Sequence, residues 1–221
     1  MSKRFRYSFS RISKTHSVDE SAVQYRDLRL RALKASPGSF ASTYEIESKF
    51  TFDTWKDRIL QGDRENLVCI ATSTDPSTSG QAEWVGQVTL RGPASKKDFS
   101  LPEASGQPPI GEDDEEEKWQ LLSLSILPEH QGQGLGQGLC QEALKYLQER
   151  RQKPRVLVRL MTKADNTATI RLYRKLGFEV VGASTLVEGL VTNGDGNLLP
   201  DDITDPKYTT RTGVIMTQRI Q

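Results

Sequence analysis

Four glycines at every second position separate an apolar run from an amphipathic segment near the middle of the chain. They are Gly132, Gly134, Gly136 and Gly138. The residues before them, 121–127, combine leucine and isoleucine with interleaved serines, which is typical of a buried strand. Residues 135–151 after them repeat apolar side chains at helical spacing. We therefore predict a strand, a glycine-rich turn and a helix, in that order.

This glycine-rich turn predicts a binding site for a phosphate or pyrophosphate. The first amides of a helix lack partners within the helix and lie at the positive end of its dipole. Glycine lets phosphate oxygens approach these amides closely. The alternative is a turn in which glycine serves only flexibility and tight packing. The spacing fits neither G-x-G-x-x-G nor G-x-x-x-x-G-K-[ST], because required glycine, lysine and hydroxyl positions are missing.

Composition excludes several other classes of function. The 221 residues include 30 Lys+Arg and 29 Asp+Glu, a net charge of +1 that gives no support for nucleic-acid or membrane binding. Two histidines are too few for a histidine-based zinc site, so we expect no metal. Cys69 and Cys140 are interpreted as buried core residues in a reducing compartment. We expect a cytoplasmic protein.

The patterns along the chain predict one α/β domain that covers residues 1–221. We predict strands at 5–12, 66–72, 83–91, 121–127, 154–162, 178–187 and 209–219, and helices at 19–35, 51–61, 135–151 and 167–176. The strand–helix–strand stretch from 121 to 162 predicts a right-handed crossover between parallel strands, whereas the earlier strands predict antiparallel hairpins. The result is a mixed sheet with helices on both faces.

Two polar insertions interrupt this pattern, near 92–118 and 189–207. The first contains the acidic run 111–117 and has the composition of a mobile loop. The acidic run predicts either a solvated insertion or attraction for a cationic substrate.

Two blocks of sequence carry a family resemblance. The block Gln131–Gly136 resembles the [Q/R]-x-x-G-x-[G/A] motif of the GNAT superfamily of acyl-CoA-dependent N-acyltransferases. The block 166–179 is similar to that family's N-x-x-A-x-x-L-Y-x-K-L-G-F signature, with Thr169 at the usual alanine. The resemblance covers 83–187 well. It implies a GNAT-like fold, with about seven mostly antiparallel strands and a splayed parallel pair.

The resemblance also implies an activity and a set of site residues. The family transfers an acetyl group from acetyl-CoA to an amine by direct attack through a tetrahedral intermediate, without a metal. By this resemblance Asn166 would contact the cofactor arm, and Tyr173 would be the general acid near the thiolate. The pantetheine arm would pair with Ser125, Ile126 and Leu127. The pyrophosphate would lie on the turn formed by Gln131, Gly132, Gln133, Gly134, Leu135, Gly136 and Gln137.

Several alternatives stay open. By periodicity alone Tyr173 would be a core aromatic residue, and the base that accepts the amine proton could be Glu117, Glu83 or a water near Ser123 or Ser125. The acceptor could be a primary amine of a small molecule or of a peptide, and the protein a monomer or homodimer. The alternatives to this enzyme are a non-catalytic acyl-CoA-binding sensor and a protein lysine or N-terminal acetyltransferase.

Overall fold

The computed structural model describes residues 5–78 and 80–221. Its strands are β1 (Phe5–Arg11), β2 (Arg64–Ser73), β3 (Ala82–Arg91), β4 (Glu116–Ile126), β5 (Arg155–Lys163), β6 (Glu179–Ser184) and β7 (Gly213–Ile220). Its α-helices are α1 (Val18–Ala35), α2 (Tyr44–Glu47), α3 (Phe52–Leu60), α4 (Lys96–Phe99), α5 (Leu135–Arg150), α6 (Thr167–Lys175), α7 (Leu186–Thr192) and α8 (Pro206–Thr209). Short 3-10 helices lie at η1 (Glu103–Ser105), η2 (Pro128–His130) and η3 (Gly196–Leu198).

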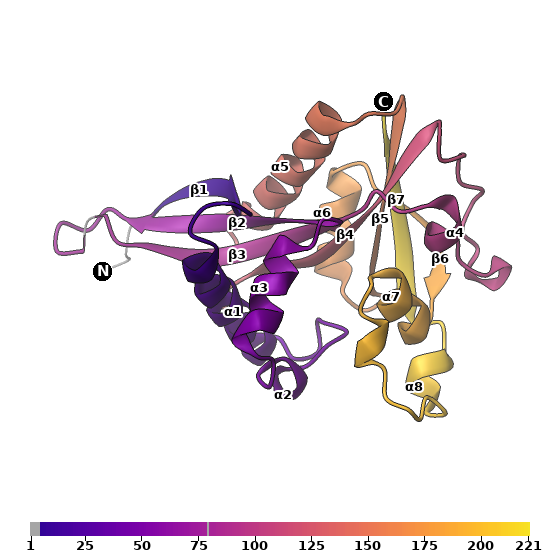
Figure 1. The fold of residues 1–221 in the computed structure, drawn as a ribbon, viewed down its shortest axis with the longest axis horizontal. Helices are drawn as coiled ribbons and strands as arrows, with labels where there is room; N and C mark the ends of the chain where they lie inside the picture. Colours follow the sequence, from indigo (N-terminus) through magenta and orange to yellow (C-terminus); the bar gives the residue numbers. More distant parts are fainter. Residues whose placement is uncertain (1–4, 79) are drawn as a thin grey trace. The chain divides into compact units, whose positions relative to one another are not determined.

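The chain divides into two compact units, and the division falls within β3, β4 and α5. Unit 1 comprises Met1–Thr89 and Ser123–Ala143, and unit 2 comprises Leu90–Leu122 and Leu144–Gln221. Hydrogen-bonded strands follow the order β1-β2-β3-β4-β5-β7-β6, in which β4 and β5 are parallel (Figure 1). This confirms the predicted mixed sheet of seven strands with its parallel pair.

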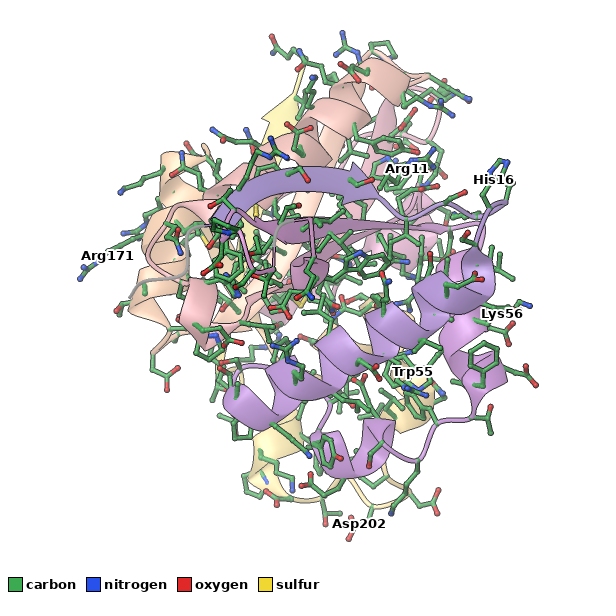
Figure 2. The ribbon with its side chains drawn as sticks, turned by 90° about the vertical axis from the view of Figure 1, so that its left-hand side faces the viewer. Arg11, His16, Trp55, Lys56, Arg171 and Asp202 are labelled. Carbon is green, nitrogen blue, oxygen red and sulfur yellow. The ribbon has the colours of Figure 1, made fainter. Side chains whose placement is uncertain are left out.

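Unit 1 is built on antiparallel strands with helices on both faces. β1 pairs with β2 from Phe5 opposite Ser73 to Arg11 opposite Leu67. On one face α1 packs against α3, which carries Trp55 (Figure 2). The Trp55 ring lies edge-on to Tyr25 of α1, at 6.1 Å between centroids. On the other face lies the first part of α5. These apolar faces follow from the helical spacing of their buried residues.

A charged cluster is buried beside α1 in unit 1. The carboxylate of Glu47 on α2 is fully buried and accepts two hydrogen bonds from Arg29, at 3.0 and 2.7 Å. A third bond comes from Arg58 on α3 at 3.3 Å. The Arg29 guanidinium also stacks on Phe40 at 4.4 Å. α2 and its N-cap Thr43 lie in a stretch for which we predicted no helix.

Unit 2 contains the parallel pair and two antiparallel ones. Residues Glu116–Gln120 of β4 pair with Arg155–Arg159 of β5, and β7 pairs with both β5 and β6. Among the described pairs, no residue of β4 beyond Gln120 has a partner on β5. Ser123 follows with φ of 57°, a left-handed conformation that interrupts regular strand geometry. The position agrees with the splayed parallel pair predicted for the fold.

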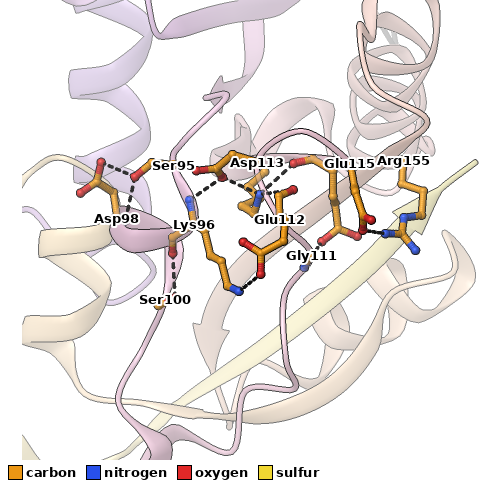
Figure 3. Close-up of polar contacts among 11 residues, drawn as sticks. Ser95, Lys96, Asp98, Ser100, Gly111, Glu112, Asp113, Glu115 and Arg155 are labelled. Carbon is orange, nitrogen blue, oxygen red and sulfur yellow. Dashed lines mark hydrogen bonds and ion pairs between the residues drawn. The ribbon is translucent and has the colours of Figure 1, made fainter.

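The first insertion is more ordered than its composition predicts, because its acidic side chains pair within unit 2 (Figure 3). It contains α4 and η1, and β4 begins at Glu116 rather than at Leu121. Lys96 pairs with Glu112 and Arg155 with Glu115, while the buried Lys118 ammonium bonds Asp113 at 2.8 Å. This bond to Lys118 holds the pKa of Asp113 below its usual range. These pairs favour a structural role over attraction of a substrate.

A helix that we did not predict, α7, begins before the second insertion and extends into it. β6 ends at Ser184, not at Val187, and α7 follows directly. Thr185 caps α7 by accepting from the backbone of Glu188, whose side chain accepts from the backbone of Thr185 in return. This T-x-x-E capping box was the sequence signal for the helix. Within the described ranges, no helix is long and apolar enough to cross a membrane.

Candidate functional site

The predicted anion-binding turn lies in unit 1, where η2 leads into α5. Gly132 and Gly134 have φ of 78° and 76°, which L-residues with side chains rarely adopt. A Cβ atom at either position would have no heavy-atom neighbour within 4 Å, so these glycines serve conformation rather than packing. The helix then starts with a bond from the Gly138 amide to Gly134 O at 3.0 Å. The preceding amides therefore lack helical acceptors.

Gly138, the last of the four glycines, has a different role. A Cβ atom there would come within 2.4 Å of the Phe9 ring of β1. The packing interpretation therefore holds at Gly138, while phosphate binding by the turn stays a prediction. Gly138 permits close packing of α5 on β1, whereas Gly132 and Gly134 shape the exposed turn.

The strand end before the turn is bonded on both of its edges. The Leu127 amide donates to Val85 O on β3 at 2.8 Å. On the other edge, Gln131 Nε2 donates to Ile126 O at 2.8 Å. The turn thus holds one of the backbone carbonyls predicted to bind the pantetheine arm.

A buried histidine supports the glycine-rich turn through the hydroxyl of Tyr7. We did not predict this role from the sequence. His130 is 2% exposed, and its Nδ1 lies 3.0 Å from the hydroxyl of Tyr7 on β1. Its Nε2 lies 3.4 Å from Glu83 Oε1. The Tyr7 hydroxyl in turn accepts from Gln133 Nε2 in the turn at 3.1 Å. The alternation of aromatic residues in β1 was the signal that could have placed Tyr7 on the α5 face.

Asn166 and Tyr173 lie in unit 2, at the start of α6 and near its end. Asn166 is the N-cap, since its Oδ1 accepts from the Thr169 amide at 3.3 Å. Tyr173 is 5% exposed, and its ring lies edge-on to Phe178 with 5.7 Å between centroids. These contacts fix the direction of α6 and the orientation of the Tyr173 ring.

Glu117, predicted as the base, also lies in unit 2. It is 8% exposed, and its carboxylate accepts from Trp119 Nε1 at 3.0 Å and from the Gln152 amide at 2.5 Å. These bonds tie the start of β4 to the chain segment after α5. Glu117 therefore has a structural role, and its catalytic role stays a prediction.

The cysteines are both free and fully buried, in β2 and α5. Burial raises the pKa of Cys69 to about 11 and that of Cys140 to about 12, so both thiols are protonated at neutral pH. Within the described residues, no group of three or more His, Cys, Asp or Glu side chains is arranged to hold a metal ion.

A turn with two positive-φ glycines at a helix start, directly after a strand that leaves its parallel partner, is the arrangement that the resemblance to the GNAT superfamily predicts. A family model described as the acetyltransferase (GNAT) family matches residues 40–178. Because this match spans more than half of the chain, the protein belongs to the GNAT acetyltransferase family.

The match between this chain and its curated relatives covers only part of each relative's length. The mycothiol acetyltransferase of Arthrobacter sp. (strain FB24) is 42% identical over 77 residues, which are 35% of this chain and 20% of that protein. That of Mycolicibacterium smegmatis is 47% identical over 61 residues, 28% of this chain and 21% of that protein. The matched region therefore spans about a fifth of these relatives.

Solved structures share the fold along the whole chain. A GNAT-family acetyltransferase from Streptococcus pneumoniae has a TM-score of 0.57 at 14% identity, covering 98% of this chain and 100% of that one. Arabidopsis thaliana NAA60 in complex with acetyl-CoA has a TM-score of 0.54 at 15% identity, covering 97% and 99%. At these identities the likeness establishes the fold alone.

Proposed function

We propose that this protein transfers the acetyl group of acetyl-CoA to a primary amine of a small molecule or a peptide. The observation that carries the proposal is the turn with positive-φ Gly132 and Gly134 at the start of α5, in a member of the GNAT family. The amides from Gln131 to Gln137 would hold the CoA pyrophosphate, because the start of a helix favours anions. One domain, residues 1–221, would carry this activity.

The pantetheine arm would bind the backbone of Ser125, Ile126 and Leu127 as an added strand. Because the Leu127 amide bonds to β3, the backbone groups of the neighbouring Ile126 point to the opposite edge of β4. That edge is the one available to an extended ligand. Gln131 would release the Ile126 carbonyl when the arm binds, and Asn166 would contact the arm through its amide nitrogen.

In the proposed reaction, the amine nitrogen attacks the thioester carbonyl carbon, and the tetrahedral intermediate then breaks its C–S bond. Tyr173 gives its phenol proton to the leaving thiolate, and a base takes the proton from the amine nitrogen. Direct attack is supported by Cys69 and Cys140, because buried, protonated thiols are poor nucleophiles for an acyl-enzyme intermediate.

For the base, Glu117 stays the predicted residue, although it would have to exchange its bonds to Trp119 and Gln152 to act. Glu83 and a water near Ser123 or Ser125 are the alternatives. The carboxylate of Glu83 is about half exposed and lies beside His130.

Acetyl-CoA should stabilise the native protein. At a ligand concentration one hundred times Kd, the free energy of unfolding should rise by about 2.7 kcal/mol, which raises Tm by roughly 5 °C or more. Differential scanning fluorimetry measures this shift. Adenosine, which lacks the pyrophosphate and pantetheine, should shift Tm much less. Equal shifts with adenosine and acetyl-CoA would contradict a pyrophosphate site on the turn.

Turnover separates the enzyme from a binding module. Thiol release from acetyl-CoA is measured with a panel of alkylamines, polyamines, amino sugars and peptides that carry N-terminal or lysine amines. We expect thiol release with at least one amine and an N-acetyl product by mass spectrometry. Stabilisation by acetyl-CoA without thiol release for any amine would instead favour the non-catalytic sensor.

Substituting Gly134 should weaken CoA binding through backbone strain alone. In Gly134→Ala, φ of 76° places the new Cβ in a strained conformation, so the turn relaxes and its amides turn away from the ligand. We expect Kd for acetyl-CoA to rise about tenfold, equivalent to about 1.4 kcal/mol, by calorimetry. The matched control is Gly62→Ala, which also has open space but has no positive φ. Unchanged affinity in Gly134→Ala would argue against anion binding there.

A further inference from the structure

Gln87 on β3 is a fully buried side chain whose amide makes no hydrogen bond. It has no exposed surface, and neither its Oε1 nor its Nε2 has a partner within residues 5–78 and 80–221. Leaving buried polar groups without partners destabilises a protein, and folded proteins contain few of them. Its strand neighbours Val85, Val88 and Leu90 are apolar. An apolar side chain at position 87 would avoid this energetic penalty. The presence of an amide there instead therefore favours a ligand as its hydrogen-bond partner.

A second unpartnered polar atom lies opposite Gln87 on β4. The bond from the Leu127 amide to Val85 O places these two residues opposite each other on antiparallel strands. Two residues along each strand, Gln87 therefore lies opposite Ser125, on the same face of the sheet. The Ser125 Oγ is buried and likewise lacks a partner in the described part of the chain. Together the two side chains offer donors and acceptors to one ligand.

Both side chains lie on the face of unit 1 that is covered by α1 and α3. Thr89, two residues after Gln87 and therefore on the same face, donates to Asn66 Oδ1 at 2.7 Å. Asn66 in turn donates to the Arg58 carbonyl of α3 at 3.2 Å. On the opposite face, a Cβ atom at Gly86 would meet Leu139 of α5. The Asn66–Thr89 pair is thus satisfied by its surroundings, whereas Gln87 and Ser125 are not.

We propose that Gln87 and Ser125 bind the acceptor, through a neutral hydrogen-bonding group next to its amine. This inference rests on the proposed function, because Ser125 belongs to the strand end assigned to the pantetheine arm. An amide and a hydroxyl carry no charge, so they suit an amide or hydroxyl of the acceptor better than a second ammonium group. The acceptor class is therefore an amine with a neighbouring amide or hydroxyl, as in a peptide N-terminus or an amino sugar.

The variant Gln87→Met tests this role because it removes the amide at similar volume. For the best amine of the panel, KM should rise about tenfold, while Kd for acetyl-CoA stays unchanged. Tm of the unliganded protein should stay equal or rise, since an unsatisfied buried amide is removed. A structural amide, or one bound only to a buried water, predicts the reverse: a lower Tm and an unchanged KM. That result would overturn the inference.

A matched control breaks the satisfied polar pair on the same face. Thr89→Val removes the hydroxyl that bonds Asn66 and leaves Asn66 Oδ1 without this donor. We expect Tm to fall in this variant, with KM for the amine unchanged. Gln87→Met should therefore raise KM without lowering Tm, whereas Thr89→Val should lower Tm without changing KM. A rise in KM in Thr89→Val equal to that in Gln87→Met would show that general loosening, not ligand contact, is measured.

Two small acceptors test the chemical class. Glycinamide carries an amide beside its amine, and isobutylamine has the same shape without it. The ratio of their kcat/KM values should fall about tenfold from wild type to Gln87→Met, and comparing the ratio between proteins cancels the intrinsic reactivity of each amine. An unchanged ratio overturns the inference while leaving the proposed function intact. Wild-type protein that acetylates no amine would contradict both.

Discussion

In Tyr173→Phe, kcat for acetyl transfer should fall about 100-fold or more, while Kd for acetyl-CoA stays within about twofold. A positioned general acid typically contributes a factor of 10² to 10⁴, and this substitution removes only the phenol oxygen. The ring itself should keep its place, because Tyr173 is buried and lies edge-on to Phe178. Steady-state thiol release at saturating acetyl-CoA gives kcat, and calorimetry gives Kd.

The matched control for this variant is Tyr208→Phe, on α8. Tyr208 is only partly buried, and its ring lies 4.8 Å from the Lys207 ammonium. This variant should keep wild-type kcat. Equal kcat for wild type and Tyr173→Phe would instead make Tyr173 a core aromatic residue, the alternative that its helical periodicity favours.

Local patterns were enough to predict most of the elements. The strand before the glycine turn and the helix after it depend on neighbours in sequence, and these predictions are confirmed. The elements that we did not predict depend on a capping motif and on ion pairs, which composition does not reveal. α7 begins with a capping box at the end of the stretch that we predicted as a strand, and β4 starts among acidic residues because Lys96, Lys118 and Arg155 neutralise them. Composition alone made that segment resemble a loop.

The candidate site was predictable only where its residues are adjacent in sequence. The turn at Gln131–Gly134 is a local motif, and its positive φ angles agree with the predicted need for glycine. The support of this turn by Tyr7 and His130 joins residues more than a hundred positions apart, which no local pattern reveals. The role proposed for Gln87 was likewise not predictable from local sequence, because its unpartnered amide becomes evident only when every neighbour in the fold is known.

Replacing Glu47 by Gln should destabilise the protein by about 3–5 kcal/mol, the usual result of removing one member of a buried ion pair. Glu47 is fully buried and Arg29 is 5% exposed, so the Arg29 charge would lose the Glu47 carboxylate as its counter-charge inside the core. Urea unfolding at pH 7 measures the change. The control Glu45→Gln, on an exposed position of the same helix, should shift the unfolding midpoint far less.

The destabilisation caused by Glu47→Gln should depend on pH, and the direction of this dependence follows from the pKa of Glu47. Burial alone would raise the pKa of Glu47, but the hydrogen bonds and charge of Arg29, with the charge of Arg58, outweigh burial and lower it. A carboxylate with a lowered pKa stabilises the fold above its unfolded-state pKa of about 4.3 and loses this contribution as pH falls through the folded-state value. The difference between wild type and Glu47→Gln should therefore be largest near neutral pH and shrink below about pH 4. A difference that stays constant down to pH 3 would show that packing of the side chain, rather than its charge, holds α2 against α1.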